Sequence, residues 1–221
     1  VQDFKSLIED GFCYVDKTAL VYHLVHSGKN AFLGRPRRFG KSLLCTTLKY
    51  YFLGERELFR GLAIEQLETE WIKRPVLHMA LNLTTYTCTD ELRQVLSGYL
   101  TQWEAIYGKG DDEVLLSQRF AGVMRRAHQQ TGLKVAVLID EYDKPLLDSM
   151  SNEALQDDLR IMLKSFYGTM KPSDEDIHFI FLTGVTKFSK VSVFSDLNNI
   201  DDITLWDDFA GICGITMQEL D

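Results

Sequence analysis

The chain contains little cysteine and no long hydrophobic segment, and each shortage excludes a class of protein. The four cysteines, Cys13, Cys45, Cys88 and Cys213, form no C-x-x-C pair and have no histidines at zinc-ligand spacing. We therefore expect free, buried thiols in a reducing cytosol rather than a disulfide framework or a zinc site. No apolar run reaches the about 18 residues that a membrane helix needs, and no signal peptide opens the chain. A cytoplasmic protein without a membrane partner is expected.

Basic charge is also scarce, since 24 lysines and arginines stand against 32 aspartates and glutamates, for a formal net charge of −8. A chain this acidic does not coat nucleic acid along its length. Its 221 residues are 45% hydrophobic, enough for the core of one large domain or of a domain with a small appendage. The chain begins at Val1 rather than at methionine and stops at Asp221, so we expect it to be a piece of a longer protein.

Four apolar runs alternate with helical patterns, an order typical of a parallel sheet flanked by helices. The runs predicted to contain strands are AFLG at 31–34, PVLHMALNL at 75–83, KVAVLIDEYDKP at 134–145 and IHFIFLTGVTKF at 177–188. Glycines mark the expected ends of three helices, at Gly28, Gly54 and Gly132, and the loop at 107–113 divides the helical region 89–131. The pattern predicts an α/β fold of three layers, with a mostly parallel central sheet between two layers of helices.

The chain divides into three expected parts. Residues 1–30 are expected to form a helical and extended lead-in packed on the core, residues 31–205 the core itself, and residues 206–221 the start of a truncated C-terminal region. In a sheet of this kind ligands bind at the carboxyl ends of the strands. The polar residues expected at those ends are Asn82, Asp140, Glu141 and Thr183, together with the segment that follows Gly34.

That segment, GRPRRFGKSL at 34–43, ends like a phosphate-binding loop but does not begin like one. The pattern G-x-x-x-x-G-K-[ST] expects glycine where Arg35 stands, and the nearest glycine, Gly34, comes one position too early. A phosphate site needs inward-facing backbone N–H groups, a helix N-terminus and a cation. The segment is followed by a predicted helix, so Lys41 is expected to reach the β- and γ-phosphates and the Ser42 hydroxyl to bind Mg²⁺.

Two readings of this loop stay open on these residues. A surface loop with solvated basic side chains would also contain Gly-Lys-Ser by chance. In the functional reading, the residues expected to contact the nucleotide are Gly34, Arg35, Pro36, Arg37, Arg38, Phe39, Gly40, Lys41, Ser42 and Leu43. Arginine binds phosphate oxygens with two parallel hydrogen bonds. Arg37 and Arg38 are therefore candidates for charge stabilisation in cis or for contact with a neighbouring subunit or another ligand, and solvated loop arginines are the alternative.

Two acids, Asp140 and Glu141, directly follow the apolar run VAVLI. Placing two carboxylates at the end of a buried strand is costly unless cations lie near them. Asp140 is therefore expected to hold Mg²⁺ and Glu141 to activate a water molecule, with Lys41 as a further nearby cation. The alternative is a strand-end turn with solvated acids.

Weaker candidates lie at the ends of neighbouring strands. Thr183 is expected to sense the γ-phosphate or to orient water, Thr186 is the second choice, and Asn82 has a similar status; a threonine at a strand end is equally often a cap. In YVDKT at 14–18, Asp16 and Lys17 either border the nucleotide base or cap the next helix, and the cap is favoured.

Taken together, the strings FLGRPRRFGKSLL, VAVLIDEYDKPL and FLTGVTKFSKVSVFSDLNNIDDIT resemble the AAA-ATPase-like proteins abundant in Bacteroidetes and other anaerobic bacteria. The N-terminal DFKSLIEDGFCYVDKTALV resembles the opening of that family as well, so the resemblance spans nearly the whole chain. It implies a P-loop NTPase of the STAND and archaeal ATPase branch with a RecA/AAA-like core. It also implies that the loop sequence R-P-R-R-F-G-K-[ST], without the first glycine, is typical of the family.

The resemblance further implies a helical or winged region and often a PD-(D/E)XK nuclease-like domain after the core. Partners are therefore expected to be a nucleotide, a second copy or another protein, and nucleic acid through that missing domain. The expected function is Mg-dependent hydrolysis of ATP, with ATP and Mg²⁺ as cofactors, coupled to a conformational change of the missing region. The alternative is a nucleotide-binding switch or scaffold with little turnover. Glu141 favours hydrolysis, whereas the altered loop favours weak activity.

Overall fold

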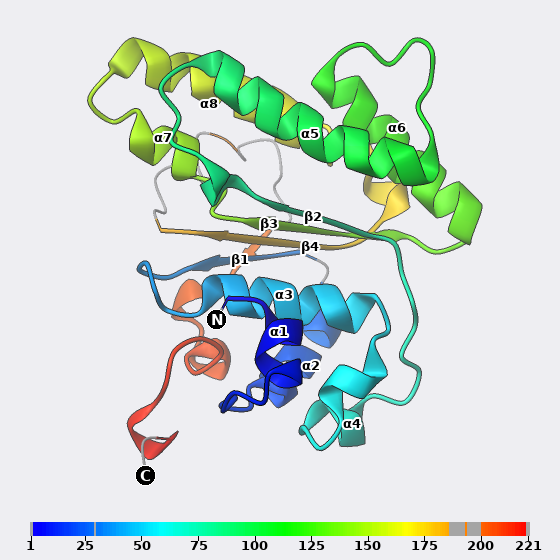
Figure 1. Ribbon diagram of the computed structural model, residues 1–221, viewed down its shortest axis with the longest axis vertical. Coiled ribbons are helices and arrows are strands. Elements are labelled where there is room, and N and C mark those ends of the chain that lie inside the picture. Colours follow the sequence, from blue (N-terminus) through cyan, green and yellow to red (C-terminus); the bar gives the residue numbers. More distant parts are fainter. Residues whose placement is uncertain (1, 29, 186–192, 194–199, 220–221) are drawn as a thin grey trace.

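The computed structural model describes residues 2–28, 30–185, 193 and 200–219, and within them a five-stranded parallel sheet forms the centre of the molecule (Figure 1). The strands lie in the order β2-β3-β4-β1-β5, and all their pairings are parallel. Their bounds are β1 Asn30–Gly34, β2 Val76–Ala80, β3 Val135–Asp140, β4 Ile177–Gly184 and β5 Asp201–Asp202. The mostly parallel α/β sheet predicted from the sequence is confirmed.

Two predicted strands need correction in detail, and a further strand was missed. The run 75–83 is a strand only to Ala80, and Leu81–Leu83 form a 3-10 turn, η2. Because β2 lies at the edge of the sheet, its residues alternate between buried and half-buried rather than being buried throughout. Strand β4 ends at Gly184, and residues 186–188 of the predicted run lie outside the described residues. Strand β5 was not predicted, since two residues are too few to carry a periodic pattern.

Helices cover both faces of the sheet, as expected (Figure 1). One layer contains α5 Thr89–Tyr107, α6 Leu116–Thr131, α7 Lys144–Asp148 and α8 Glu153–Gly168. The other contains α1 Phe4–Glu9, α2 Thr18–Ser27, α3 Lys41–Phe52 and α4 Ile64–Leu67. Short 3-10 helices connect these elements: η1 Arg56–Phe59, η3 Asp174–Asp176, η4 Ile203–Leu205, η5 Asp207–Phe209 and η6 Met217–Glu219.

The strand residues divide between two hydrophobic cores because successive side chains point to opposite faces of a sheet. In β3, Val137 and Ile139 pack with the layer of α5, α6 and α8. Their neighbours Ala136 and Leu138 pack with the layer of α1, α2 and α3. All six residues of β3 are buried, which explains its unbroken apolar pattern in the sequence.

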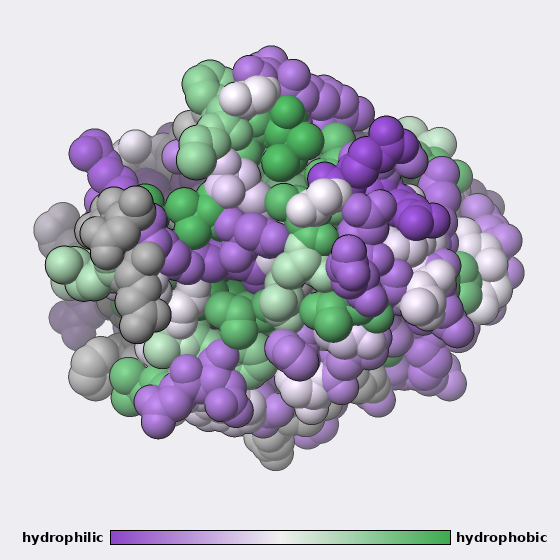
Figure 2. Space-filling model, turned by 90° about the horizontal axis from the view of Figure 1, so that it is seen from below, coloured by the Kyte–Doolittle hydropathy of each residue, from purple (hydrophilic) through white to green (hydrophobic). Residues whose placement is uncertain are grey.

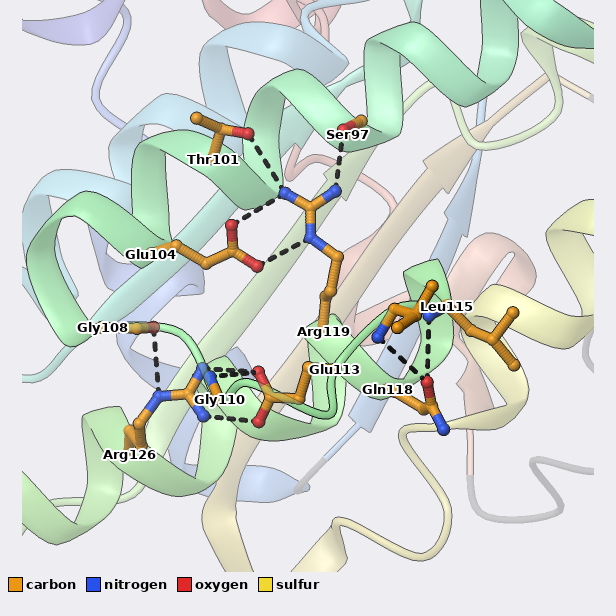
Figure 3. Close-up of polar contacts among 11 residues, drawn as sticks. Ser97, Thr101, Glu104, Gly108, Gly110, Glu113, Leu115, Gln118, Arg119 and Arg126 are labelled. Carbon is orange, nitrogen blue, oxygen red and sulfur yellow. Dashed lines mark hydrogen bonds and ion pairs between the residues drawn. The ribbon is translucent and has the colours of Figure 1, made fainter.

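The loop between α5 and α6 is fixed by paired charges, which we call the helix clamp (Figure 3). Arg119 donates to both carboxylate oxygens of Glu104, at 2.7 and 2.8 Å, and to the hydroxyls of Ser97 and Thr101. Arg126 donates to both oxygens of Glu113, at 2.5 and 2.9 Å. The predicted break at 107–113 is confirmed, and the clamp explains how a polar loop is held against two helices.

The four cysteines are free, as predicted, but not all are buried. Cys45 is buried and Cys213 half-buried, whereas Cys13 and Cys88 are exposed. In the described part of the chain, none of the helices is long and apolar enough to cross a membrane. On the face that carries α1, α2 and α4, hydrophobic residues form separate groups among hydrophilic ones (Figure 2), which is ordinary for a protein surface.

Candidate nucleotide site

The carboxyl ends of the strands bring the predicted polar residues to one edge of the sheet. In the register of β3 and β4, Ile139 pairs with Leu182, so Asp140 and Thr183 follow side by side. In the register of β1 and β4, Gly34 pairs with Gly184. Strand β4 therefore separates the strand that leads into the loop from the strand that carries the acids.

The loop leaves β1 as extended chain. The Arg35 N–H donates to the Gly184 carbonyl at 3.2 Å, which continues the pairing of β1 with β4 by one residue. Positive φ angles fall later, at Arg38 (66°) and Gly40 (80°). This left-handed region costs a residue with a side chain free energy and suits glycine. Arg35 thus needs no glycine-like conformation, which removes the steric objection to arginine at this position.

Helix α3 begins at the end of the loop, with Gly40 at its N-cap and no side-chain hydrogen bond capping it. The first N–H groups of a helix lack partners within the helix and favour an anion. Lys41 is buried, and its Nζ donates to the carbonyls of Arg35 and Pro36, both at 2.9 Å. Lys41, the first residue of α3, therefore connects the helix N-terminus to the first half of the loop.

A cavity of about 460 Å³, which we call the loop cavity, opens beside these groups. It is lined by Gln2, Arg37, Arg38, Gly40, Lys41, Ser42, Leu43, Asn82 and Glu141. Residues of the loop, of β2's end and of β3's end thus face one space. Basic groups and one carboxylate share it, a combination that suits phosphate with a metal ion.

The two acids after β3 have different surroundings. Asp140 is buried and accepts a hydrogen bond from the Thr183 hydroxyl at 2.5 Å. The same hydroxyl accepts from the Glu141 N–H at 3.2 Å, so Thr183 fixes the backbone between the two acids. Asp140 and Thr183 are buried, whereas Glu141 lines the loop cavity.

Glu141 has an uncommon backbone conformation and a carboxyl group whose pKa is raised. Its φ is 53°, an uncommon value for a residue with a side chain. Burial raises the pKa of its carboxyl above the ordinary glutamate value, and the neighbouring Asp140 raises it further. Lys41 and Arg37 oppose this rise in the pKa. A raised pKa and strained backbone in one residue of a cavity are typical of functional sites.

A second cavity, of about 260 Å³, lies on the other side of the loop and is called the apolar cavity below. It shares Arg38, Gly40 and Leu43 with the loop cavity. The rest of its lining comes from three stretches of chain: Leu7, Cys13, Tyr14, Val15 and Lys17; Phe39, Leu44 and Thr47; Ile212, Cys213, Gly214 and Ile215.

Asp16 and Lys17 have separate contacts. Asp16 accepts from the N–H of Thr18 at 2.8 Å and from the N–H of Ala63 at 2.7 Å, so it serves the start of α2, as favoured from the sequence. Lys17 borders the apolar cavity and forms an ion pair with Glu219.

Some of the predicted contact residues do not line the loop cavity. The guanidinium of Arg35 donates to the carbonyls of Gly34 and Thr204, away from the loop cavity. Gly34 packs against Thr204 as well, and Phe39 lines only the apolar cavity. Thr186 lies outside the described residues.

Two contributors to this region escaped the sequence reasoning. Gln2 lines the loop cavity from the N-terminal segment, and Thr204 contacts the loop from the C-terminal one. Gln2 belongs to no motif, and Thr204 ends the string FLTGVTKFSKVSVFSDLNNIDDIT without a predicted role at the site. Both residues reach the site through long-range packing.

Comparisons with known proteins agree with this geometry. A family described as predicted AAA-ATPase matches residues 1–194. The chain belongs to this AAA-ATPase-like family. The match covers the loop, both acids and Thr183, so family membership supports a nucleotide-binding ATPase domain. The resemblance inferred from the sequence is confirmed at this level.

A relative from Azotobacter chroococcum mcd 1, described as "Uncharacterized protein in vnfD 5'region", is 39% identical over 223 residues. The alignment covers 100% of this chain and 43% of the relative, so the AAA-ATPase-like chain spans less than half of that protein's length. No solved structure matches the chain.

The residues present fit a magnesium nucleotide. Ser42, which lines the loop cavity, carries an oxygen of the kind that Mg²⁺ prefers, whereas the carboxylate of Asp140 is buried and does not line this cavity. The uncapped N-terminus of α3 and the basic groups of the loop suit a polyphosphate. Burial and the neighbouring Asp140 raise the pKa of Glu141, and a bound cation would favour its charged form.

Proposed function

We propose that this chain is a P-loop ATPase domain that hydrolyses ATP with Mg²⁺. The observation that carries the proposal is the meeting, in one cavity, of the loop residues Lys41 and Ser42 with Glu141 from a strand two places away in the sheet. These motifs stand about a hundred residues apart in the sequence and meet at the carboxyl ends of the strands, where α/β sheets bind ligands. Family membership supports the same conclusion.

The nucleotide is assigned to both cavities. The phosphates occupy the loop cavity, where the Lys41 ammonium, the N-terminus of α3 and the Arg37 guanidinium bind their oxygens. The base occupies the apolar cavity between Tyr14 and Phe39, because an aromatic heterocycle suits an apolar space with few polar groups. Lys41 exchanges its hydrogen bonds with the loop carbonyls for the phosphates when the nucleotide binds.

Hydrolysis is assigned to Glu141 acting on water. Its carboxylate faces the loop cavity and accepts a proton from the attacking water as general base. Thr183 holds Asp140 and the Glu141 backbone in place. Ser42 and Asp140 would hold Mg²⁺, which neutralises charge on the phosphates. Asn82 lines the cavity from β2's end and is assigned to water orientation.

A switch with little turnover is the second candidate. It is favoured by Lys41, which is already satisfied by two loop carbonyls and must give up these bonds to reach a phosphate. In this reading ATP binding changes the rest of a longer protein, by assembly or by a conformational change, and hydrolysis merely resets the state. The partner would be a second copy, another protein or nucleic acid.

Phosphate release by purified protein separates the two candidates. Glu141→Gln is expected to keep Mg·ATP binding and to lose phosphate release by about a hundredfold or more, the usual contribution of a general base. Lys41→Ala is expected to lose binding and release together. Equal phosphate release from the wild type and Glu141→Gln would contradict the role of Glu141 and leave the switch as the better description.

A further inference from the structure

The segment from Asp201 to Glu219 begins with β5 and returns to the nucleotide loop. Strand β5 pairs in parallel with β1, matching Asp201 with Ala31 and Asp202 with Phe32. The chain then turns at η4, where the Asp202 carboxylate accepts from the Thr204 N–H at 3.1 Å and fixes this residue. Thr204 is thereby placed beside the exit of β1, where the loop begins.

Two hydrogen bonds join Thr204 to the first residues of the loop. Its hydroxyl accepts from the Gly34 N–H at 2.9 Å, and its carbonyl accepts from the Arg35 guanidinium. A side chain on Gly34 would lie 3.3 Å from that hydroxyl, so the contact is tight. The two bonds use backbone and side-chain groups of both segments, and we call them the Thr204 clasp.

The same segment reaches the loop at two further places. Residues 212–215 form one wall of the apolar cavity, and Gly214 packs against the Phe39 ring and close to Gly40. Glu219 then forms an ion pair with Lys17, which lines the apolar cavity, with its Oε2 2.6 Å from the lysine Nζ. The hydrogen bond from the Lys17 ammonium lowers the pKa of the Glu219 carboxyl to about 2, so this carboxylate stays charged over the physiological range.

We propose that Arg35 and Thr204 are positioning residues that couple the nucleotide loop to the segment 201–219. Arginine stands where the usual loop has glycine because its side chain holds this segment rather than a phosphate. The proposal rests on the proposed function, since it describes regulation of the same site. Arg35 lies within residues 1–194, which the family model matches, whereas Thr204 and the segment 201–219 lie beyond them.

The coupling follows from the contacts on both sides of the loop. Nucleotide in the apolar cavity touches the wall formed by residues 212–215, while its phosphates fix the loop that Arg35 begins. Nucleotide and segment therefore stabilise each other, and by linkage the effect is reciprocal. Ordering the segment raises nucleotide affinity, and binding nucleotide slows the local opening of the segment. Whatever displaces residues 201–219 would release nucleotide.

Hydrogen–deuterium exchange of the whole chain tests this coupling, with and without the nonhydrolysable analogue AMP-PNP and Mg²⁺. In the wild type, saturating analogue is expected to slow exchange in peptides covering 203–215 by about fivefold or more, the lower end of typical coupling between sites. Arg35→Ala and Thr204→Val are each expected to lose most of this protection, even where the analogue is bound at saturation.

Matched controls separate the clasp from a general loss of structure. Thr204→Ser keeps the hydroxyl and is expected to keep the protection that Thr204→Val loses. Arg37→Ala removes an arginine from the same loop that lines the cavity but has no part in the clasp. It is expected to weaken analogue binding and, once saturated, to show wild-type protection at 203–215.

The outcomes distinguish this proposal from the proposed function. Binding of the analogue without any change at 203–215, or full protection in Arg35→Ala and Thr204→Val, would overturn the clasp and leave the nucleotide site intact. A wild type that does not bind the analogue, measured by calorimetry in the same samples, would overturn both.

Discussion

The helix clamp and the loop cavity both gather charged side chains, but they differ in where the opposite charge comes from. In the clamp, the side chains of Arg119 and Glu104 are about 90% buried, and the arginine donates two hydrogen bonds to the carboxylate. At the loop cavity, Glu141 has acidic neighbours, and the ammonium of Lys41, whose charge lowers the pKa of Glu141, donates to loop carbonyls. The charges of the first group are paired within the protein, whereas under the proposed function a ligand would supply the partner of the second.

The pKa directions express the same difference. Hydrogen bonds from Arg126 hold the pKa of the Glu113 carboxyl below the ordinary glutamate value. Burial, together with Asp140, raises the pKa of the Glu141 carboxyl. A lowered pKa means that the fold favours the charged form, and a raised one means that it opposes it. Removing a charged group should therefore lower the stability of the fold at the helix clamp and raise it at Glu141. Four predictions follow from this difference.

Removing Arg119 from the helix clamp is expected to have the largest effect on stability. Arg119→Met keeps much of the apolar stem but leaves the Glu104 carboxylate buried without its partner. Breaking a buried pair in this way costs about 3 kcal/mol of unfolding free energy. Urea denaturation measures the loss, with Mg·ATP affinity unchanged. A similar loss of affinity would show that the two regions are not independent.

Glu113→Gln is expected to cost less, because Arg126 is more exposed and can recover water. Losing the charged hydrogen bonds costs about 2 kcal/mol at pH 7. Since the pKa of Glu113 is lowered in the fold, its contribution is present above its unfolded pKa and is lost as pH falls through the folded value. The difference between wild type and variant should therefore shrink in acid. A constant difference from pH 7 to pH 3 would argue against the ion pair.

The pH dependence of phosphate release sharpens the assignment of Glu141. A general base must be deprotonated, so its raised pKa places the acid limb of the rate profile above the ordinary glutamate value. Arg37 lowers this pKa, so Arg37→Ala is expected to move the limb to higher pH at saturating ATP. A shift to lower pH would contradict the position of the arginine.

The smallest effect expected is a gain in stability. Glu141→Gln removes a carboxylate that the folded protein opposes, so the nucleotide-free variant should be more stable at pH 7 by about 0.5 kcal/mol, a modest gain of the kind found at strained active sites. Because wild-type Glu141 takes up its proton more readily when folded, this gain should vanish at low pH. A loss of stability in Glu141→Gln would mean that the fold uses the charge.

Much of the fold was predictable because it depends on local patterns. The run VAVLI in β3 is buried on both faces and reads as a strand at once. Gly132 ends α6 with a φ of 69°, a conformation that favours glycine. The edge position of β2 and the two-residue β5 depend on which strands become neighbours, and no local pattern carries that information.

The candidate site divides in the same way. Lys41, Ser42 and Glu141 were placed together from strand-end reasoning, and the structure brings them to one cavity. Their chemical roles stay predictions. Arg35 was expected at the nucleotide, but its side chain binds the carbonyl of Thr204, about 170 residues later in the chain. A hydrogen bond between such distant segments depends on β5 joining β1, and no local pattern of residues predicts that pairing.

The dependence of stability on Mg·ATP tests the central contrast most directly. Unfolding free energies of wild type, Arg119→Met and Lys41→Ala would be measured with and without Mg·ATP. At free ligand about a hundredfold above its Kd, binding to the folded state adds about 2.7 kcal/mol. Wild type and Arg119→Met are expected to gain this amount from different baselines, and Lys41→Ala to gain nothing. An equal gain in Lys41→Ala would contradict a nucleotide site at this loop.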